Sequence, residues 1–415
     1  MSDSRHFKSF TKAFLEYCHN VDAPESYKYW SALSVIAGAI ERKVWYTTGK
    51  IWWYPNLYVF LVGERSTRKS TSSKVAVGLL KELSEANINT AQMNIASLIR
   101  DMSELSLTNS FEYFGKHYKH ASMFIFASEA AMVLGDMYAN GSPTKYLVEV
   151  YNCGDDGPSD KPIIAKSTMK DKQTMIYNPC VNILACSTPA WLMTELLNPS
   201  DVEGGFGSRI LFVVHQGEYD SKDEVPTADG LQDESLRLKL VEELTSMSKL
   251  RGNFTATPEW RQAIGTYSKQ HKLWMAEHKH SDKMLTSCLA RKTDSTIYKL
   301  SMLLSLNESN AMVLEARHAH EAWALLTNLE ANLPYAFGKF GVTDEMRHTF
   351  DIMSYAKDTR KAELDLRDLC RVFSKVHSTK RIREGLKDLE AQGKITLNPT
   401  KSKYPYELVY TIQSY

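Results

Sequence analysis

The sequence predicts an α/β protein with a three-layer core, in which a parallel sheet lies between two layers of helices. Four short apolar runs are continuous rather than alternating, as expected for strands that are buried on both faces of a parallel sheet. Helical patterns separate these runs, and the first run breaks at a glycine before a helix begins. The predicted strands are residues 57–62, 123–127, 181–186 and 210–214.

Length and composition set the outer limits of the prediction. The chain has 415 residues, enough for two or three domains, and its net charge is only +1, so affinity for a polyanion must come from local patches. The six scattered cysteines include no Cys-x-x-Cys pair, which argues against a zinc ribbon and for a reduced, intracellular protein. Without a signal peptide or an apolar run of membrane-spanning length, we expect a cytoplasmic protein with no membrane contact.

The break after the first strand carries the most informative motif. Gly63, Lys69 and Ser70 have the spacing of a phosphate-binding loop, G-x-x-x-x-G-K-[ST], although Arg68 stands where the second glycine belongs. Such a loop binds phosphates through backbone N–H groups, the lysine and the following helix N-terminus, while its hydroxyl holds Mg²⁺. We therefore expect ATP and Mg²⁺ here, with a solvated loop as the alternative. The expected nucleotide contacts are Gly63, Glu64, Arg65, Ser66, Thr67, Arg68, Lys69, Ser70 and Thr71.

Polar residues also follow the second and third predicted strands. Ser128 and Glu129 stand where many P-loop ATPases carry Asp-Glu, in which the first acid supports Mg²⁺ and the second polarises the attacking water. We expect Glu129 to be the catalytic base and Ser128 to support hydrated Mg²⁺ together with Ser70; the alternative for Glu129 is an ordinary surface residue. Ser187 or Thr188 is expected to sense the γ-phosphate, although such hydroxyls also cap helices.

Two arginines are candidates for stabilising charge in the transition state. Arg209 follows a glycine-rich stretch and enters the fourth strand, so it is placed at an exposed edge from which it could reach a neighbouring subunit's γ-phosphate. Arg291, at the start of a predicted helix, is a second candidate for nucleotide contact. The predicted catalytic set is therefore Lys69, Glu129 and Arg209.

A lysine-rich insertion lies between the second and third strands. Residues 163–176 read as strand, tip and strand, with Lys166, Lys170 and Lys172 around the tip. Lysines on a protruding hairpin are suited to gripping the phosphates of a nucleic-acid strand. The alternative is a solvated turn.

Three regions are predicted before residue 346. Residues 1–50 read as a helical collar, residues 51–225 hold the core, and residues 226–345 are helical throughout and would form a lid. Aromatic residues near Trp45 and Trp52 read as a hairpin whose side chains serve core packing more readily than base stacking.

Residues 346–415 change in character and become more basic. Two predicted helices followed by a β-hairpin describe a winged helix, in which Ile382, Leu386 and Leu389 form the buried stripe. The alternative is a packing domain with a solvated basic face. The predicted DNA contacts on the second helix are Lys380, Arg381, Arg383 and Lys387, with Lys401 and Lys403 in the wing.

Taken together, the motifs resemble a family of phage and prophage P-loop ATPases of unknown function, over roughly residues 14–326. The loop of that family likewise reads Gly-x-x-x-x-Arg-Lys-[Ser/Thr], and many members carry glycine at the position of Ser66. The other matching motifs are Phe14-Leu-Glu-Tyr17, Ala23-Pro-Glu25, Trp30-x-Ala-Leu33, Arg42-Lys-Val-Trp45, Tyr54-Pro-Asn-Leu-Tyr58 and Gly204-Gly-Phe-Gly-Ser-Arg209.

The resemblance implies a AAA+ or RecA-like module of the ASCE type, similar to the MCM and superfamily 3 helicases. In those proteins a hairpin tracks single-stranded DNA inside a hexameric ring, so Lys170 or Lys172 corresponds to its tip and Arg209 to a finger acting in trans. The implied function is a replicative DNA helicase of a phage or mobile element, with a primase as a possible partner. An ATP-dependent initiator or helicase loader and a degenerate P-loop scaffold are the alternatives.

Overall fold

The computed structural model describes most of the chain, and each of its two compact units, Met1–Pro334 and Tyr335–Tyr415, is described by itself. The predicted domain boundaries near 225 and 345 lie outside the described residues. The described residues are 5–90, 92–134, 144–154, 157–162, 164–168, 171–192, 205–215, 233–278, 287–337, 352–353, 355–356, 359, 361–373, 378–391, 393–402 and 408–413.

A five-stranded parallel sheet forms the centre of the first unit, in the order β11-β3-β10-β7-β4. All four predicted strands are confirmed, and every residue of these four is buried, which explains their continuous apolar sequences. The fifth strand was missed because it has only two residues, one of them polar. The strands are β3 (Tyr58–Val62), β4 (Ile88–Asn89), β7 (Ala121–Ala127), β10 (Pro179–Ser187) and β11 (Ile210–Val214).

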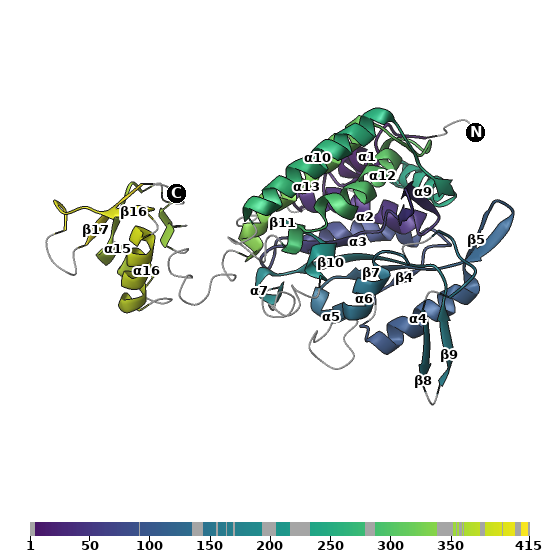
Figure 1. Ribbon diagram of the computed structural model, residues 1–415, viewed down its shortest axis with the longest axis horizontal. Helices are drawn as coiled ribbons and strands as arrows, with labels where there is room; N and C mark the ends of the chain where they lie inside the picture. The colour runs from purple at the N-terminus through teal and green to yellow at the C-terminus, as the bar shows by residue number, and fades with distance from the viewer. Residues whose placement is uncertain are drawn as a thin grey trace. The chain divides into compact units, whose positions relative to one another are not determined.

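Helices cover both faces of this sheet, so the three-layer α/β prediction holds for the core (Figure 1). On one face, α2 is buried on nearly all sides from Trp30 to Ile40, where its sequence consists of apolar and small residues, and it packs between the sheet and the outer helices. The expected collar and lid meet here, because α1 and α2 contact α9 and α12. This layer contains α1 (Phe10–Tyr17), α2 (Glu25–Ile40), α3 (Lys69–Lys81), α9 (Glu234–Ser248), α10 (Pro258–His278), α12 (Ile297–Glu308) and α13 (Ala316–Phe337); α4 (Ile95–Thr108), α5 (Ala130–Leu134) and α6 (Thr144–Val150) lie on the other face.

Among the described residues of the first unit, three pairs of strands form β-hairpins beside the central sheet. The two predicted ones are confirmed: β1 (Val44–Thr48) pairs with β2 (Ile51–Trp53), and β8 (Ile164–Thr168) pairs with β9 (Asp171–Ile176). Trp45, Tyr46 and Tyr54 are buried, in agreement with a packing role. The third hairpin, β5 (Ser110–Tyr113) with β6 (Lys116–Lys119), was missed in a polar segment.

The prediction that residues 226–345 are helical throughout is wrong at three short strands. β12 (Gly252–Asn253) extends the β1 ladder, and β13 (Thr255–Ala256) pairs with β14 (Val313–Leu314). Pairing with segments distant in sequence decides their conformation, which a local helical pattern cannot reveal. A π-helical turn, η4 (Lys292–Thr296), also precedes α12.

The second unit contains the elements expected for residues 346–415. Its described residues include the helices α15 (Leu366–Val372) and α16 (Thr379–Ala391), followed by β16 (Ile395–Leu397) and β17 (Val409–Ile412), which pair antiparallel. A further strand, β15 (Glu363–Asp365), was missed; it pairs with β17 and completes a sheet of order β15-β17-β16. The predicted stripe of α16 is buried: Ile382, Leu386 and Leu389 are at most 1% exposed.

Within the described parts of the chain, the structure contains no helix with the length and apolarity needed to cross a membrane.

Close packing between α2, α3 and the sheet predicts a sharp effect of one substitution. A Cβ atom at Gly38 in α2 would lie 2.6 Å from the Phe124 ring and 2.7 Å from a methyl group of Leu80. Gly38→Ala should therefore lower the free energy of unfolding by about 1–3 kcal/mol through overpacking, measured by urea denaturation. The matched control is Gly265→Ala in α10, where a Cβ meets nothing within 4 Å. It should raise stability by about 0.5–1 kcal/mol. Equal stability of the two variants would contradict the packing argument.

Candidate functional site

The loop between β3 and α3 begins at a glycine that is required by close packing. A Cβ atom at Gly63 would lie 2.4 Å from Tyr27 Oη and 2.8 Å from Thr67 Oγ1. Tyr27 Oη donates a hydrogen bond to the Val62 carbonyl at 2.7 Å, and the Gly63 N–H donates to the Ser187 carbonyl at 3.3 Å. Gly63 therefore lets α2, the loop and the end of β10 meet at one point.

Two residues further along the loop adopt left-handed backbone conformations. Ser66 has φ 69° and Arg68 has φ 56°, on either side of Thr67. This conformation costs an L-residue about 1–2 kcal/mol, and turns of this kind are typical of the backbone concavities that bind anions. Arg68 occupies the position of the second glycine in the G-x-x-x-x-G-K-[ST] pattern. The loop thus adopts the left-handed conformation without glycine, the residue that tolerates it with little strain.

Arg68 directs its side chain toward Asp22. Its Nε lies 3.6 Å from Asp22 Oδ2, and the side chain is 53% exposed. Asp22 belongs to the segment between α1 and α2. The guanidinium therefore contacts a carboxylate at the rim of the loop, although Arg68 also contributes to the wall of the adjoining cavity.

Lys69 is the first residue of α3, and its ammonium group points back into the loop. Nζ donates to the carbonyls of Gly63 at 2.7 Å and Glu64 at 2.6 Å, and to Thr67 Oγ1 at 3.1 Å. Burial lowers the pKa of Lys69, while the nearby Cys186, Glu64 and Glu129 oppose that shift. A phosphate group would be an alternative partner for this ammonium, which is already held beside the concavity.

A cavity of about 560 Å³ brings most of the predicted site together. Its volume lies in the range of small-molecule sites. Of the predicted loop residues, Gly63 and Glu64 do not line it; their carbonyls instead accept hydrogen bonds from Lys69. The wall consists of Arg65, Ser66, Thr67, Arg68, Lys69, Ser70, Thr71, Ser128, Glu129, Ala130, Ala131, Cys186, Ser187, Thr188 and Trp191.

Strand register explains why residues so distant in sequence meet. Ser187 pairs with Val62, and Ala185 pairs with Ala127, so β3, β7 and β10 end at the same edge of the sheet. Glu129 is exposed at the start of α5, and Ser128 is half-buried beside it. This placement leaves the carboxylate of Glu129 accessible to water at the cavity.

The hydroxyl groups after β10 already have local partners. Thr188 Oγ1 accepts a hydrogen bond from the Trp191 N–H at 3.3 Å and caps α7 (Pro189–Trp191), which is the capping role considered above. Ser187 Oγ donates to the Thr188 carbonyl at 3.3 Å. Both residues nevertheless line the cavity, so Ser187 stays a predicted γ-phosphate sensor.

Four residues of the cavity wall were not predicted from the sequence: Ala130, Ala131, Cys186 and Trp191. Cys186 is the penultimate residue of a buried strand, and burial raises the pKa of its thiol to about 11, so it is neutral at pH 7. Ser73 Oγ lies 3.6 Å from its sulfur. Trp191 lies shortly after Ser187, the last residue of β10. This closeness in sequence to a predicted site residue could have identified it.

Arg209 and Arg291 lie apart from this cavity. Arg209 ends the short helix η2 (Gly207–Arg209) and precedes Ile210, which pairs with Tyr58 at the start of β3. It therefore lies at the amino edge of the sheet, one five-residue strand or about 16 Å from the edge where the loop begins. Arg209 donates to the Gly205 carbonyl at 2.6 Å, and Arg291 donates to Asn152 Oδ1 at 3.3 Å.

Both arginines act on the same buried tyrosine. The Arg209 guanidinium lies 5.8 Å from the Tyr151 ring centre. Burial raises the pKa of Tyr151 to about 12, and the charges of Arg291 and Arg209 oppose the shift. Within one chain, neither arginine is part of the cavity wall.

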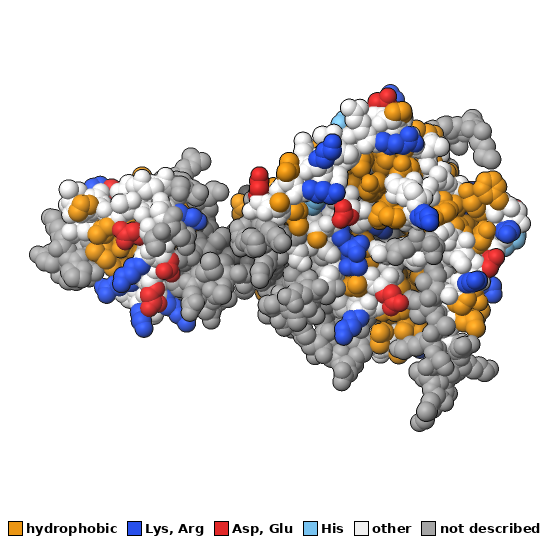
Figure 2. Space-filling model, viewed as in Figure 1, with side chains coloured by type: hydrophobic (Ala, Val, Ile, Leu, Met, Phe, Trp, Pro, Cys, Tyr) orange, Lys and Arg blue, Asp and Glu red, His pale blue; other side chains and the backbone are white. Residues whose placement is uncertain are grey.

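The predicted DNA contacts are described only in part. Lys166 and Lys172 lie on β8 and β9, but their side chains, like the whole of Lys170 and Lys403, fall outside the described residues. In the second unit, Lys380, Arg381, Arg383 and Lys387 are exposed on α16, where Figure 2 shows Lys and Arg side chains gathered. Lys401 instead forms an ion pair with Glu363 at 2.7 Å.

No protein-family model matches the chain, and no curated protein shows significant similarity to it.

The strained backbone at Arg68 can be separated from its side chain by two substitutions. Arg68→Gly and Arg68→Ala both remove the contact with Asp22, but only glycine relieves the left-handed strain. We expect the glycine variant to have the higher free energy of unfolding, by about 1 kcal/mol, in urea denaturation. ATP affinity, measured with a fluorescent analogue, should change little in either variant, since the guanidinium points to Asp22. A loss of affinity shared by both variants would instead show that the guanidinium contacts the nucleotide.

Proposed function

We propose that this protein is an ATP-hydrolysing DNA motor, a ring-forming replicative helicase of a phage or mobile element. The observation that carries the proposal is the single cavity lined by the loop after β3, Ser128 and Glu129 after β7, and Ser187 after β10. A phosphate-binding loop, a carboxylate and a polar sensor at one sheet edge are the parts that nucleotide hydrolysis requires. The position of β10 between β3 and β7 also supports an ASCE-type ATPase, because one additional strand separates the loop from Glu129.

Each residue has a role that follows from its position. The curved loop backbone and the N-terminus of α3 would bind the phosphates of Mg²⁺-ATP, with Lys69 exchanging its loop carbonyls for phosphate oxygens. The hydroxyl of Ser70 would bind Mg²⁺, which neutralises developing charge when it is present, and Ser128 would support its water shell. Glu129 would orient and polarise the attacking water from the accessible side of the cavity.

The location of Arg209 favours action between subunits. Because Arg209 lies at the opposite edge of the sheet from the cavity of its own chain, a contribution to hydrolysis requires the cavity of a neighbour. Its neighbour Arg291 would belong to the same intersubunit contact. Ring assembly, which we propose to be hexameric, would therefore complete each site with charge from the next subunit.

A second function is favoured by the C-terminal unit. Two helices, a three-stranded antiparallel sheet and exposed basic residues on α16 support a winged-helix domain that binds duplex DNA. Such a domain suits a replication initiator or helicase loader, which would use ATP only for assembly. Displacement of a strand from a forked DNA by the protein alone distinguishes the helicase from the loader.

Substitutions in the cavity separate binding from hydrolysis. Lys69→Ala should abolish ATP binding, whereas Glu129→Gln should retain binding and lower turnover by about 10²–10⁴-fold, since it removes only the base. The measurements are Mg²⁺-dependent phosphate release and binding of labelled ATP. Glu259→Gln, which changes an exposed carboxylate on α10, is the control and should keep wild-type turnover. A wild-type protein with no more turnover than Lys69→Ala would indicate a degenerate scaffold.

The proposed trans action of Arg209 predicts complementation. Arg209→Ala alone should lower kcat by about 10³-fold or more, the usual contribution of an arginine finger, with ATP affinity retained. Mixing this variant with Lys69→Ala should restore part of the activity, because some interfaces then join an intact loop to an intact arginine. Steady-state phosphate release across a series of mixing ratios measures the effect. If mixtures stay as inactive as the separate variants, Arg209 does not act in trans.

A further inference from the structure

The β5–β6 hairpin ends in a residue that the fold itself does not explain. Tyr113 pairs with Lys116, so Phe114 and Gly115 form a two-residue loop with φ values of 50° and 70°. Positive φ at both positions is the type I′ geometry, for which Asn-Gly is strongly preferred. A bulky residue with positive φ is an outlier, and strain of this kind is concentrated at functional sites.

Packing does not compensate for the strain at Phe114. The side chain is 87% exposed, the highest exposure among the large hydrophobic side chains that the structure describes as exposed. Its contact is with Tyr113, whose ring centre is 4.4 Å away. An asparagine would suit the turn better, so the aromatic ring has a use outside the folded chain.

The base of the hairpin is firmly held. Phe111 is buried in an aromatic cluster with Trp45 and Tyr54, and Tyr113 packs edge-on against Trp45 with ring centres 4.8 Å apart. The strained tip is therefore presented from a rigid support. Rigid aromatic side chains lose little conformational entropy on binding, which makes them effective contact residues.

Basic and aromatic side chains surround this tip. Lys116, His117 and Lys119 are exposed on β6, and the Lys119 ammonium lies 5.6 Å from the Tyr177 ring centre. Glu112 lies opposite His117 in the hairpin register, and with a neutral histidine the hairpin carries one net positive charge, from its two lysines and one glutamate. Figure 2 shows hydrophobic, basic and His side chains together at the edge where Figure 1 places β5.

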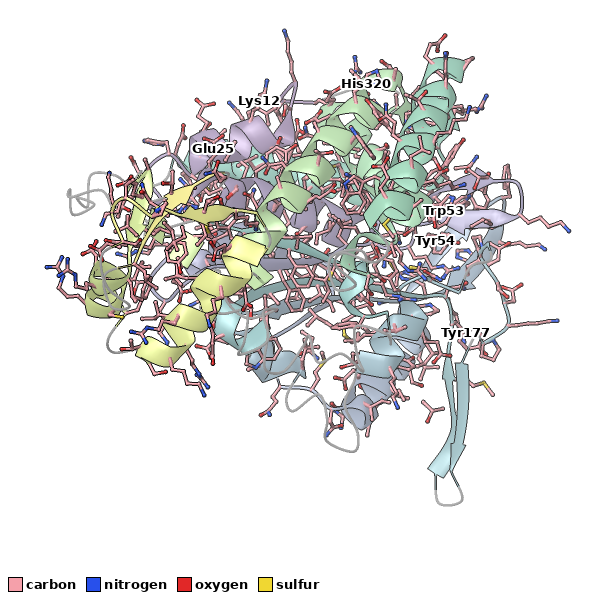
Figure 3. The ribbon with its side chains drawn as sticks, turned by 60° about the vertical axis from the view of Figure 1, so that its left-hand side comes forward. Lys12, Glu25, Trp53, Tyr54, Tyr177 and His320 are labelled. Carbon is pink, nitrogen blue, oxygen red and sulfur yellow. The ribbon has the colours of Figure 1, made fainter. Side chains whose placement is uncertain are left out.

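The same surface continues to the β8–β9 hairpin. Tyr177 follows β9 at the base of that hairpin, as Figure 3 shows. The Tyr177 carbonyl accepts from the Ala121 N–H at 2.9 Å, and Asn178 Nδ2 donates to the Lys119 carbonyl at 2.7 Å. Two neighbouring hairpins thus arise from adjacent strands of the sheet, with aromatic and basic groups between them.

We propose that Phe114 stacks on a base of single-stranded nucleic acid while Lys116 and Lys119 contact its phosphates. Stacking on aromatic side chains combined with lysine contacts is the chemistry of single-strand binding, and paired bases inside a duplex do not present their faces. Lysine is depleted in protein–protein interfaces, which disfavours a protein partner. The inference rests on the proposed function, because it assigns part of the strand contact to a hairpin distinct from β8–β9.

The test uses a substitution that separates binding from folding. Phe114→Asn supplies the residue preferred by the turn, so the full-length variant should unfold at the wild-type temperature or higher. Its affinity for a fluorescein-labelled oligothymidylate of about 20 nucleotides should fall by about 5- to 100-fold, measured by fluorescence anisotropy with an ATP analogue present. Phe114→Trp keeps a stacking ring and should retain binding.

An oligomer of abasic deoxyribose phosphates provides the matched ligand. Wild type and Phe114→Asn should bind it equally, since it has phosphates but no bases. Unchanged oligothymidylate affinity of Phe114→Asn would overturn the inference, and a loss of self-association instead of strand binding would reassign the residue to a protein contact. Wild-type ATP turnover is measured separately: its absence defeats the proposed function, whereas turnover without any Phe114 effect defeats only this inference.

Discussion

The hydrogen bond from the Gly63 N–H to the Ser187 carbonyl joins the ends of two parallel strands, and the organisation of the site depends on that alignment. β3 pairs with β10 on one side and with β11 on the other, so its register fixes both neighbours. Parallel strands that share one register have all their carboxyl ends at one edge. The loop and Ser187 are thus joined directly, and the pairing of β7 with β10 brings Glu129 to the same edge.

The same parallel register determines what lies at the opposite edge. The amino ends of β7, β10 and β11 receive the β5–β6 hairpin, the β8–β9 hairpin and Arg209, respectively. Each of these three strands is buried along its entire length, and β7 and β10 run directly to Ser128 and Ser187. A close-packed interior transmits displacement rather than absorbing it. The buried strands thus form short connections between the cavity and the two hairpins, which is the connection that a nucleotide-driven motor would use.

Much of this arrangement could be read from the sequence because burial on both faces leaves a continuous apolar pattern. The four longer strands are such runs, and the loop at Gly63 and the carboxylate of Glu129 come directly after two of them. β4 was missed since Ile88 and Asn89 have no pattern of their own, and pairing with β7 alone defines them. The direction of the Arg68 side chain depends on Asp22, and the separation of Arg209 from the cavity depends on strand register. Neither long-range relation leaves a local signal.

Backbone strain gives a more selective guide to function than exposure does, provided that each outlier is compared with its own contacts. Asn178, with φ 43°, is explained inside the chain: its side chain donates to the carbonyls of Lys119 and Ser159 and accepts from the Ser159 N–H. Asparagine also tolerates this conformation, so both the residue type and its hydrogen bonds account for the positive φ. The left-handed backbone of Ser66 and Arg68 matches the curve that the proposed phosphate-binding loop requires.

Phe114 differs from all three, because its residue type opposes its backbone and its ring is exposed. Sequences are generally consistent across local preference, packing and fold, and exceptions concentrate where a further requirement acts. At the loop, the proposed phosphate site would impose such a requirement on the backbone shape. At the hairpin tip, nothing in the fold accounts for an exposed phenylalanine with positive φ. A nucleic-acid strand accounts for both features of the tip, because its bases can stack on the ring and its phosphates can bind the neighbouring lysines.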